Sequence, residues 1–135
     1  MASGRRWLRM ASTNTSGMPF VLNYSHGDRL AVAEVTGLAF IEDAGELVER
    51  IARQTLAHGD KRLLINLLDV VGTMERHDHE HLGKLAFAHL GHLEKVASLV
   101  PEDKITRVSQ QTAISLGMQL RVFTSVGDAI EWLVA

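Results

Sequence analysis

Residues 76–81 read RHDHEH and gather three histidines, an aspartate and a glutamate into six positions. Imidazole and carboxylate groups bind zinc in proteins, and histidine is also the commonest general acid or base. Residues four apart share one face of a helix, so His77 and His81 are the credible ligand pair in this stretch. A structural zinc needs four ligands, and the sequence has no H-E-x-x-H motif. We therefore expect no metal here, with His77 and His81 as a weak alternative.

Acid–base catalysis needs a pocket and an oriented partner as well as a histidine. The sequence contains no G-x-S-x-G nucleophile motif and neither G-x-G-x-x-G nor G-x-x-x-x-G-K-[ST], the phosphate-binding motifs. Asp78 and Glu80 instead suit the start of a helix, where acidic side chains interact favourably with the helix dipole. The stretch is interpreted as the solvated start of a helix, and we expect no cofactor.

The composition is that of one globular domain. The chain has 135 residues, of which 46% are hydrophobic and 22% charged, and it contains no cysteine. Disulfides, thiolate metal sites and cysteine nucleophiles are therefore excluded. No apolar run approaches the roughly 20 residues that span a bilayer, so we expect a cytoplasmic protein without a membrane span.

Charge is distributed unevenly along the chain. Residues 1–17 hold three arginines and no acid, which leaves 11 of the 14 basic residues and all 16 acidic residues in the remainder, a net charge of −5. A body of this charge is a poor match for a nucleic acid. The Ser-, Thr-, Asn- and Gly-containing segment 1–17 is predicted to be a flexible tail, and residues 18–135 a single domain that could start at Met18.

Strand patterns recur from Pro19 onward. PFVLNYS and RLAVAEVTG flank a turn at Gly27 and predict an antiparallel hairpin. LLINLL, residues 63–68, is apolar on both faces apart from Asn66, which is typical of a central buried strand. KVASLV and LRVF predict two further strands.

Helical spacing separates these strands. The first helix is predicted over residues 41–58, with Gly59 as its stop, and the second over residues 78–93. A third runs from Pro101 to Gly117, and a fourth follows Ser125, which forms a capping pair with Asp128. The buried positions predicted on the last three helices are Leu82, Ala86, Leu90 and Leu93; Ile105, Val108, Thr112 and Leu116; and Val126, Ala129, Ile130 and Leu133.

The order β-β-α-β-α-β-α-β-α predicts an α/β fold. We expect a single domain with a mixed, mostly parallel β-sheet, an N-terminal antiparallel hairpin and about four packing helices. In such a sheet, function is expected at the carboxyl ends of the strands.

From about Pro19 to Val134 the chain resembles a STAS domain, the fold of bacterial anti-sigma-factor antagonists and their SpoIIAA-like relatives. The resemblance is carried by the strand end VTG, AGELVERIARQTLAHG, LLINLLDV, KVASLVP with the helix up to Gly117, and LRVFTSVGDAIEWL. It implies a non-enzymatic regulatory module that binds a protein partner, such as an anti-sigma factor or a kinase-like regulator.

The resemblance also implies a phosphorylatable serine or threonine in the loop after the central strand. When the sequences are aligned without a gap, Glu75 takes the acceptor position, so the usual motif is absent. Glutamate carries a charge of −1, where phosphoserine carries about −1.5 to −2. Thr73 is a weak alternative acceptor. The predicted partner-binding loop comprises Gly72, Thr73, Met74, Glu75, Arg76 and His77.

A second class of function stays open. Relatives of this fold can hold apolar ligands between helices and sheet, which implies a small-molecule or lipid carrier as the alternative. PFVLNY and the helix carrying Phe87 are the candidate walls of such a pocket, although Phe20 and Phe87 are also typical core residues. A ligand retained by the purified protein would distinguish the carrier from the partner-binding module.

Overall fold

The computed structural model describes residues 20–38, 41–71 and 75–135. The predicted tail 1–17, the predicted start at Met18 and the loop residues 72–74 lie outside the described residues.

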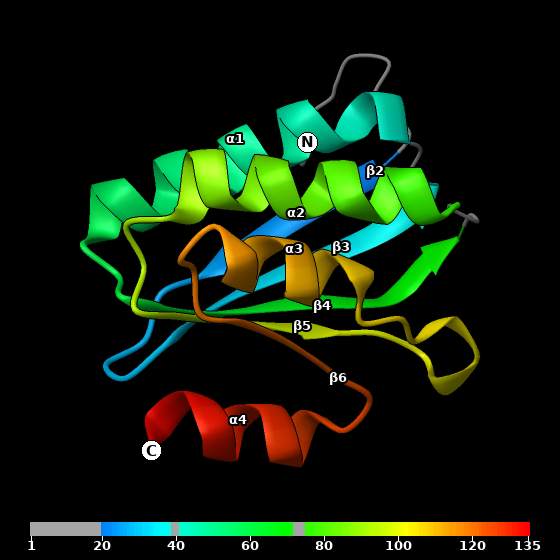
Figure 1. Ribbon diagram of the computed structural model, residues 1–135. Helices are drawn as coiled ribbons and strands as arrows, with labels where there is room; N and C mark the ends of the chain where they lie inside the picture. Colours follow the sequence, from blue (N-terminus) through cyan, green and yellow to red (C-terminus); the bar gives the residue numbers. More distant parts are fainter. Residues whose placement is uncertain (1–19, 39–40, 72–74) are drawn as a thin grey trace, which may run out of the picture.

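Five strands in the described part of the chain form one mixed sheet in the order β2-β3-β4-β5-β6 (Figure 1). The strands are β2 (Phe20–Ser25), β3 (Ala31–Leu38), β4 (Arg62–Val71), β5 (Lys95–Leu99) and β6 (Leu120–Phe123). β2 and β3 form the predicted antiparallel hairpin, and β4, β5 and β6 follow β3 in parallel. The predicted fold class is confirmed, and LLINLL lies in the central strand.

Helices cover the two faces of the sheet unequally. α1 (Ile41–His58), α2 (Arg76–Leu90) and α3 (Val108–Ser115) lie on one face, and α4 (Val126–Val134) lies on the other (Figure 1). Parallel crossovers are right-handed, and each one here moves to the next strand in the same direction, so the three connecting helices share a face. The sheet therefore has no point at which the strand order reverses.

Each face of the sheet has its own core. Alternation along β3 sends Ala31 and Ala33 toward the three-helix side, while Leu30 and Val32 contact the core under α4. On the three-helix side, Ile51, Leu63 and Leu90 are almost completely buried.

The third predicted helix is much shorter in the structure than in the prediction. Pro101 opens only a 3-10 turn, η1 (Glu102–Lys104), and Ile105 is extended, so α3 begins at Val108. Ile105 and Leu116 are 41% and 43% exposed, so the predicted buried face is wrong at both ends. Gly117 ends the helix as predicted, with a positive φ of 104° that a glycine adopts without strain.

Two other helices differ from the prediction in detail. α2 spans 76–90 rather than 78–93, because the Glu75 backbone N–H donates to the Asp78 carboxylate at 3.0 Å and fixes an earlier start. In α4 the capping pair is confirmed, since the Asp128 N–H donates to Ser125 Oγ at 3.4 Å. A single stripe of α4 meets the sheet, so Ala129 and Leu133 are buried as predicted. Val126 and Ile130 are exposed, contrary to the prediction.

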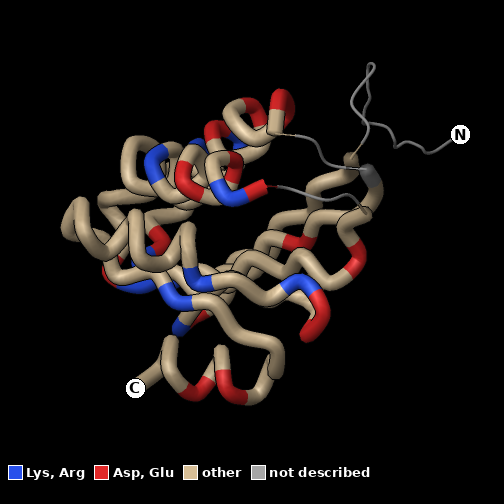
Figure 2. Tube along the Cα trace, turned by 45° about the vertical axis from the view of Figure 1, so that its right-hand side comes forward, with Lys and Arg blue, Asp and Glu red and all other residues tan. Residues whose placement is uncertain are grey.

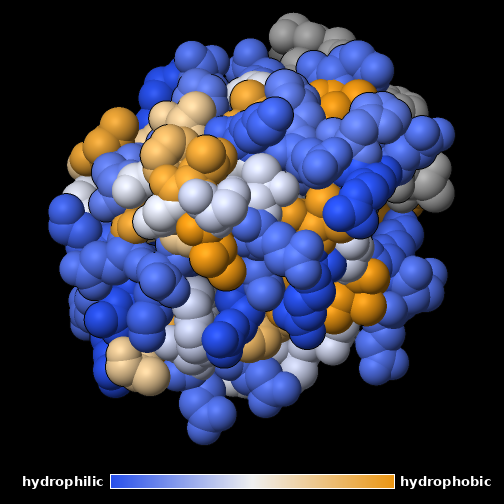
Figure 3. Space-filling model, viewed as in Figure 1, coloured by the Kyte–Doolittle hydropathy of each residue, from blue (hydrophilic) through white to orange (hydrophobic). Residues whose placement is uncertain are grey.

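Charges of both signs are interspersed over the described surface (Figure 2). Exposed hydrophobic side chains form separate patches among hydrophilic ones on the face over α2 and α3 (Figure 3). Scattered groups of this kind are normal on a globular protein. Within the described residues, no helix is long and apolar enough to cross a membrane.

Candidate functional site

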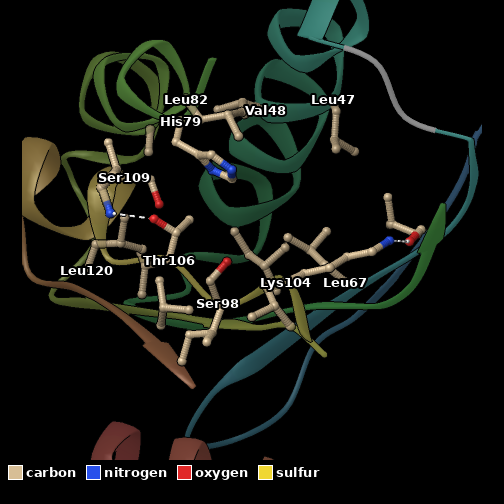
Figure 4. A pocket seen from close by; sticks show the side chains of 18 of the residues that line it. Leu47, Val48, Leu67, His79, Leu82, Ser98, Lys104, Thr106, Ser109 and Leu120 are labelled. Atoms are coloured by element: carbon tan, nitrogen blue, oxygen red, sulfur yellow. Dashed lines mark hydrogen bonds between the residues drawn. The ribbon is translucent and has the colours of Figure 1, made fainter. Parts of the chain in front are cut away.

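A cavity of about 570 Å³ lies between the sheet and its three-helix face. Its roof is formed by α1, α2 and α3, and its floor by β4, β5 and β6 (Figure 4). The apolar side chains of the roof include Leu47, Val48, Ile51, Leu82, Ala86 and Leu90. The volume falls within the range of roughly 300–1,000 Å³ typical of small-molecule sites.

An irregularity in β4 shapes the floor. Two steps along β3, from Glu34 to Thr36, face three steps along β4, from Asn66 to Asp69, so β4 contains one extra residue. The Asn66 side chain accepts a hydrogen bond from the backbone N–H of Leu68 at 3.0 Å and supports this turn. A bulge of this kind changes which side chains face a site. Leu67 and Val70, three residues apart, therefore both line the cavity.

A close contact between α2 and α3 fixes one side of the roof. A β-carbon at Gly83 would lie 2.7 Å from the Ser109 carbonyl oxygen and 2.8 Å from Thr112 Cβ. These separations are shorter than van der Waals contact, so only glycine permits this approach of the two helices. Gly83 thus sets the position of α2, which carries Leu82 and His79 into the cavity wall.

Four uncharged polar side chains lie among the mostly apolar residues that line the cavity. His79 reaches in from α2, Ser98 from β5, and Thr106 and Ser109 from the segment that starts α3 (Figure 4). Burial lowers the pKa of His79, and the smaller opposing effect of Asp78 does not cancel it. The His79 imidazole is therefore neutral at pH 7.

Charged residues lie where the cavity reaches the surface. Arg76, Asp103 and Lys104 are exposed members of its lining. The Lys104 ammonium donates to the Val70 carbonyl oxygen at 3.2 Å and links η1 to the end of β4. This mouth lies at the carboxyl ends of the parallel strands, the edge of the sheet at which a functional site is predicted from the sequence.

The predicted partner-binding loop adjoins this mouth. Glu75, Arg76 and His77 are exposed at the start of α2, and Arg76 also belongs to the cavity lining. Gly72, Thr73 and Met74 lie outside the described residues, so the weak acceptor Thr73 is not placed.

His77 and His81, the alternative metal ligands, are not joined by further ligands in the described residues. His77 lies 3.3 Å from the Asp78 carboxylate and 3.8 Å from that of Glu75, and His81 is exposed one turn further on. Over the described ranges, no group of three or more His, Asp or Glu side chains is placed to hold a metal ion.

The predicted walls of the carrier pocket are partly wrong. α2 does line the cavity, but Phe87 on that helix is 40% exposed and outside the lining, and Phe20 is a buried core residue. The floor is formed by β4, β5 and β6, and not by residues 20–24 of β2 at the edge of the sheet. No sequence pattern indicated Ser98, Thr106 or Ser109, because residues far apart in the chain meet only in the folded cavity.

A second polar cluster, also missed from sequence, lies at the amino ends of the strands. The buried Asp60 carboxylate accepts from the Tyr24 hydroxyl at 2.6 Å and lies 2.7 Å from His26 Nδ1. The His58 ring stacks on both Tyr24 and His26. Burial, together with the hydrogen bond to and the charge of Asp60, raises the pKa of Tyr24. The cluster joins the β2–β3 hairpin to the α1–β4 turn.

Known proteins share this fold. A family model described as SpoIIAA-like matches residues 30–134. An anti-sigma factor antagonist from Mycobacterium paratuberculosis is 18% identical, with a TM-score of 0.59, over 84% of this chain and 93% of that one. No curated protein matches the chain.

Two further solved structures share the fold. SpoIIAA in its unphosphorylated form is 15% identical, with a TM-score of 0.54, over 84% of this chain and 96% of that one. A protein with a SpoIIAA-like fold from Shewanella loihica is 18% identical, with a TM-score of 0.52, over 90% of this chain and 99% of that one. The family match covers most of the sequence, and the fold agrees with it. The chain belongs to the SpoIIAA-like family.

Proposed function

We propose that this chain is a non-enzymatic carrier or sensor of a small apolar molecule, which it holds between the sheet and helices α1, α2 and α3. The observation that carries the proposal is the cavity of about 570 Å³ with its mostly aliphatic lining. Burying apolar ligand surface there would be favourable by about 25 cal/mol per Å². The proposal includes a cytoplasmic location and the absence of a resident metal or cofactor.

Native mass spectrometry of the purified chain tests this function. We expect a retained small molecule that is released on denaturation. Ala86→Phe adds a ring inside the lining and should abolish retention, whereas Ala88→Phe, exposed on the same helix, should not. Circular dichroism would verify that both variants are folded. A bare chain from every preparation that also binds no added apolar compound would contradict the proposal.

The second candidate is a protein-interaction module whose partner contacts the segment 72–77. The exposure of Glu75, Arg76 and His77 at the carboxyl end of the central strand supports it, as does the fold shared with anti-sigma factor antagonists. In this proposal Glu75 supplies a fixed negative charge where a phosphoserine would stand, and the partner is an anti-sigma factor or kinase-like regulator.

Affinity capture with two variants tests the interaction module. Glu75→Ala should weaken partner binding if the charge is recognised, and Glu75→Ser should permit phosphorylation by a serine kinase of the same host. Unchanged partners and unchanged phosphorylation in both variants would contradict it. The exposed Glu80→Ala on the same helix is the matched control.

A further inference from the structure

The interior of the cavity and its mouth differ in chemistry. Arg76, Asp103 and Lys104 carry the charges of the lining, and all three are exposed at the mouth. The polar groups further inside, on His79, Ser98, Thr106 and Ser109, are hydroxyls and an imidazole. Their side chains point into the same space from the roof, the floor and one side (Figure 4).

These inner groups have hydrogen-bonding capacity to spare. Toward other described residues, the hydroxyls of Ser98 and Ser109 and the ring of His79 make no hydrogen bond. Thr106 Oγ1 accepts from the Val108 N–H at 3.3 Å, which leaves its own O–H free to donate. Polar groups in an apolar enclosure normally have partners, and a few convergent ones fix the orientation of a ligand.

The same groups suit an uncharged partner. Each hydroxyl can donate or accept, and the neutral His79 ring offers one donor and one acceptor. A carboxylate or ammonium group at that depth would lose its hydration without meeting an opposite charge, which is strongly unfavourable.

We propose that the cavity binds an aliphatic molecule that carries one uncharged oxygen function, a hydroxyl or a carbonyl, and that this oxygen lies among His79, Ser98, Thr106 and Ser109. This inference rests on the proposed function and adds the ligand class. It distinguishes a neutral lipophile from a fatty acid, whose carboxylate would be held at the mouth by Arg76 or Lys104.

Four compounds that share an eight-carbon chain but differ in their polar group test the proposed ligand class. 1-Octanol, 2-octanone, octanoate and octylammonium are titrated at pH 7.5, with binding followed by amide chemical shifts and by the rise in Tm. We expect the alcohol and the ketone to bind at least tenfold more tightly than either ion. Ser98→Ala should weaken octanol binding by roughly 3- to 10-fold, the effect of one lost hydrogen bond, and leave octanoate unchanged. Ser25→Ala, exposed on β2, is the matched control.

Two outcomes overturn the inference, and they are distinguishable. Tightest binding by octanoate, with loss in Arg76→Gln or Lys104→Gln, would replace the neutral ligand with an anionic one and leave the carrier function standing. Failure of all four compounds, together with a bare chain in native mass spectrometry, would overturn the carrier function as well. His79→Phe adds a second check, because it should reduce octanol binding while His81→Phe, exposed on the same helix, should not.

Discussion

The folded structure lowers the pKa of His79 and the pKa of His92 from the usual histidine value. Burial is the main cause for both, with Asp78 opposing it at His79 and the positive charge of Lys61 adding to it at His92. The His92 ring also lies 2.9 Å from the buried Thr55 hydroxyl, whose own proton is donated to the Ala52 carbonyl. Both rings therefore favour the neutral form more strongly in the folded chain than in the unfolded one.

Acid is expected to destabilise the protein through these two rings. In the unfolded chain they take up protons near pH 6.5, while in the folded chain they do so only at lower pH. Between those values the unfolded state binds more protons, so the free energy of unfolding falls as the pH is lowered from about 6.5. Urea titrations at several pH values should show this decline, and His79→Gln should make it shallower. His81→Gln is the exposed control; equal slopes in both variants would contradict the role of burial.

The buried carboxylate of Asp60 should make the stability of the fold sensitive to the loss of its hydrogen-bond partners. Its side chain is 5% exposed and is held by Tyr24 and His26. Tyr24→Phe keeps the ring beside His58 but removes a hydrogen bond to a buried acid, so we expect a loss of roughly 1–3 kcal/mol in the free energy of unfolding. Ser25→Ala, next in the strand, should change it little. A loss as small as that control would show that Asp60 does not depend on Tyr24.

Substitution of two glycines in helices should change the free energy of unfolding in opposite directions. Gly83→Ala would place a methyl group against Ser109 and Thr112, so it should destabilise the fold and separate α2 from α3. At Gly45 in α1, a methyl group would meet no neighbouring atom within 4 Å, and Gly45→Ala should stabilise by roughly 0.5–1 kcal/mol through helix propensity. Chemical denaturation of both variants measures the difference. Stabilisation by Gly83→Ala would contradict the close contact.

The elements themselves could be predicted from sequence because each must bury one face. The alternation in RLAVAEVTG and the apolar run LLINLL predicted the hairpin and the central strand, and Gly59 and Gly117 marked two helix ends correctly. The third helix could not be bounded in this way. Its apolar spacing continues from Ile105, but an extended backbone there separates a 3-10 turn from the helix.

Little of the cavity could be predicted from the sequence. The predicted partner-binding loop stays a prediction, and the mouth of the cavity lies next to it, at the carboxyl end of β4 and the start of α2. The cavity itself depends on the Asn66 bulge, which is a matter of pairing between two strands, and on the Gly83 contact between two helices. Neither leaves a periodic pattern in the sequence.

At the scale of the whole molecule, the tail remains a prediction from composition. Residues 1–17 are mostly small polar residues and arginines. We expect that a chain beginning at Met18 keeps the Tm of the full chain to within a few degrees, as measured by circular dichroism. A larger fall would mean that the segment contributes to the packed structure.

The strand order of the sheet places three helices and the cavity on one side and the single helix α4 on the other. The folded chain thus has a cavity on the three-helix side of the sheet that its unfolded form does not have. Because unfolding eliminates that volume, hydrostatic pressure should favour the unfolded state, and nuclear magnetic resonance under pressure should show the amides of α1 and α2 losing native signals before those of α4. A compound that fills the cavity should restore resistance to pressure, so the pressure at which the chain unfolds becomes a measure of occupancy that needs no knowledge of what the occupant is.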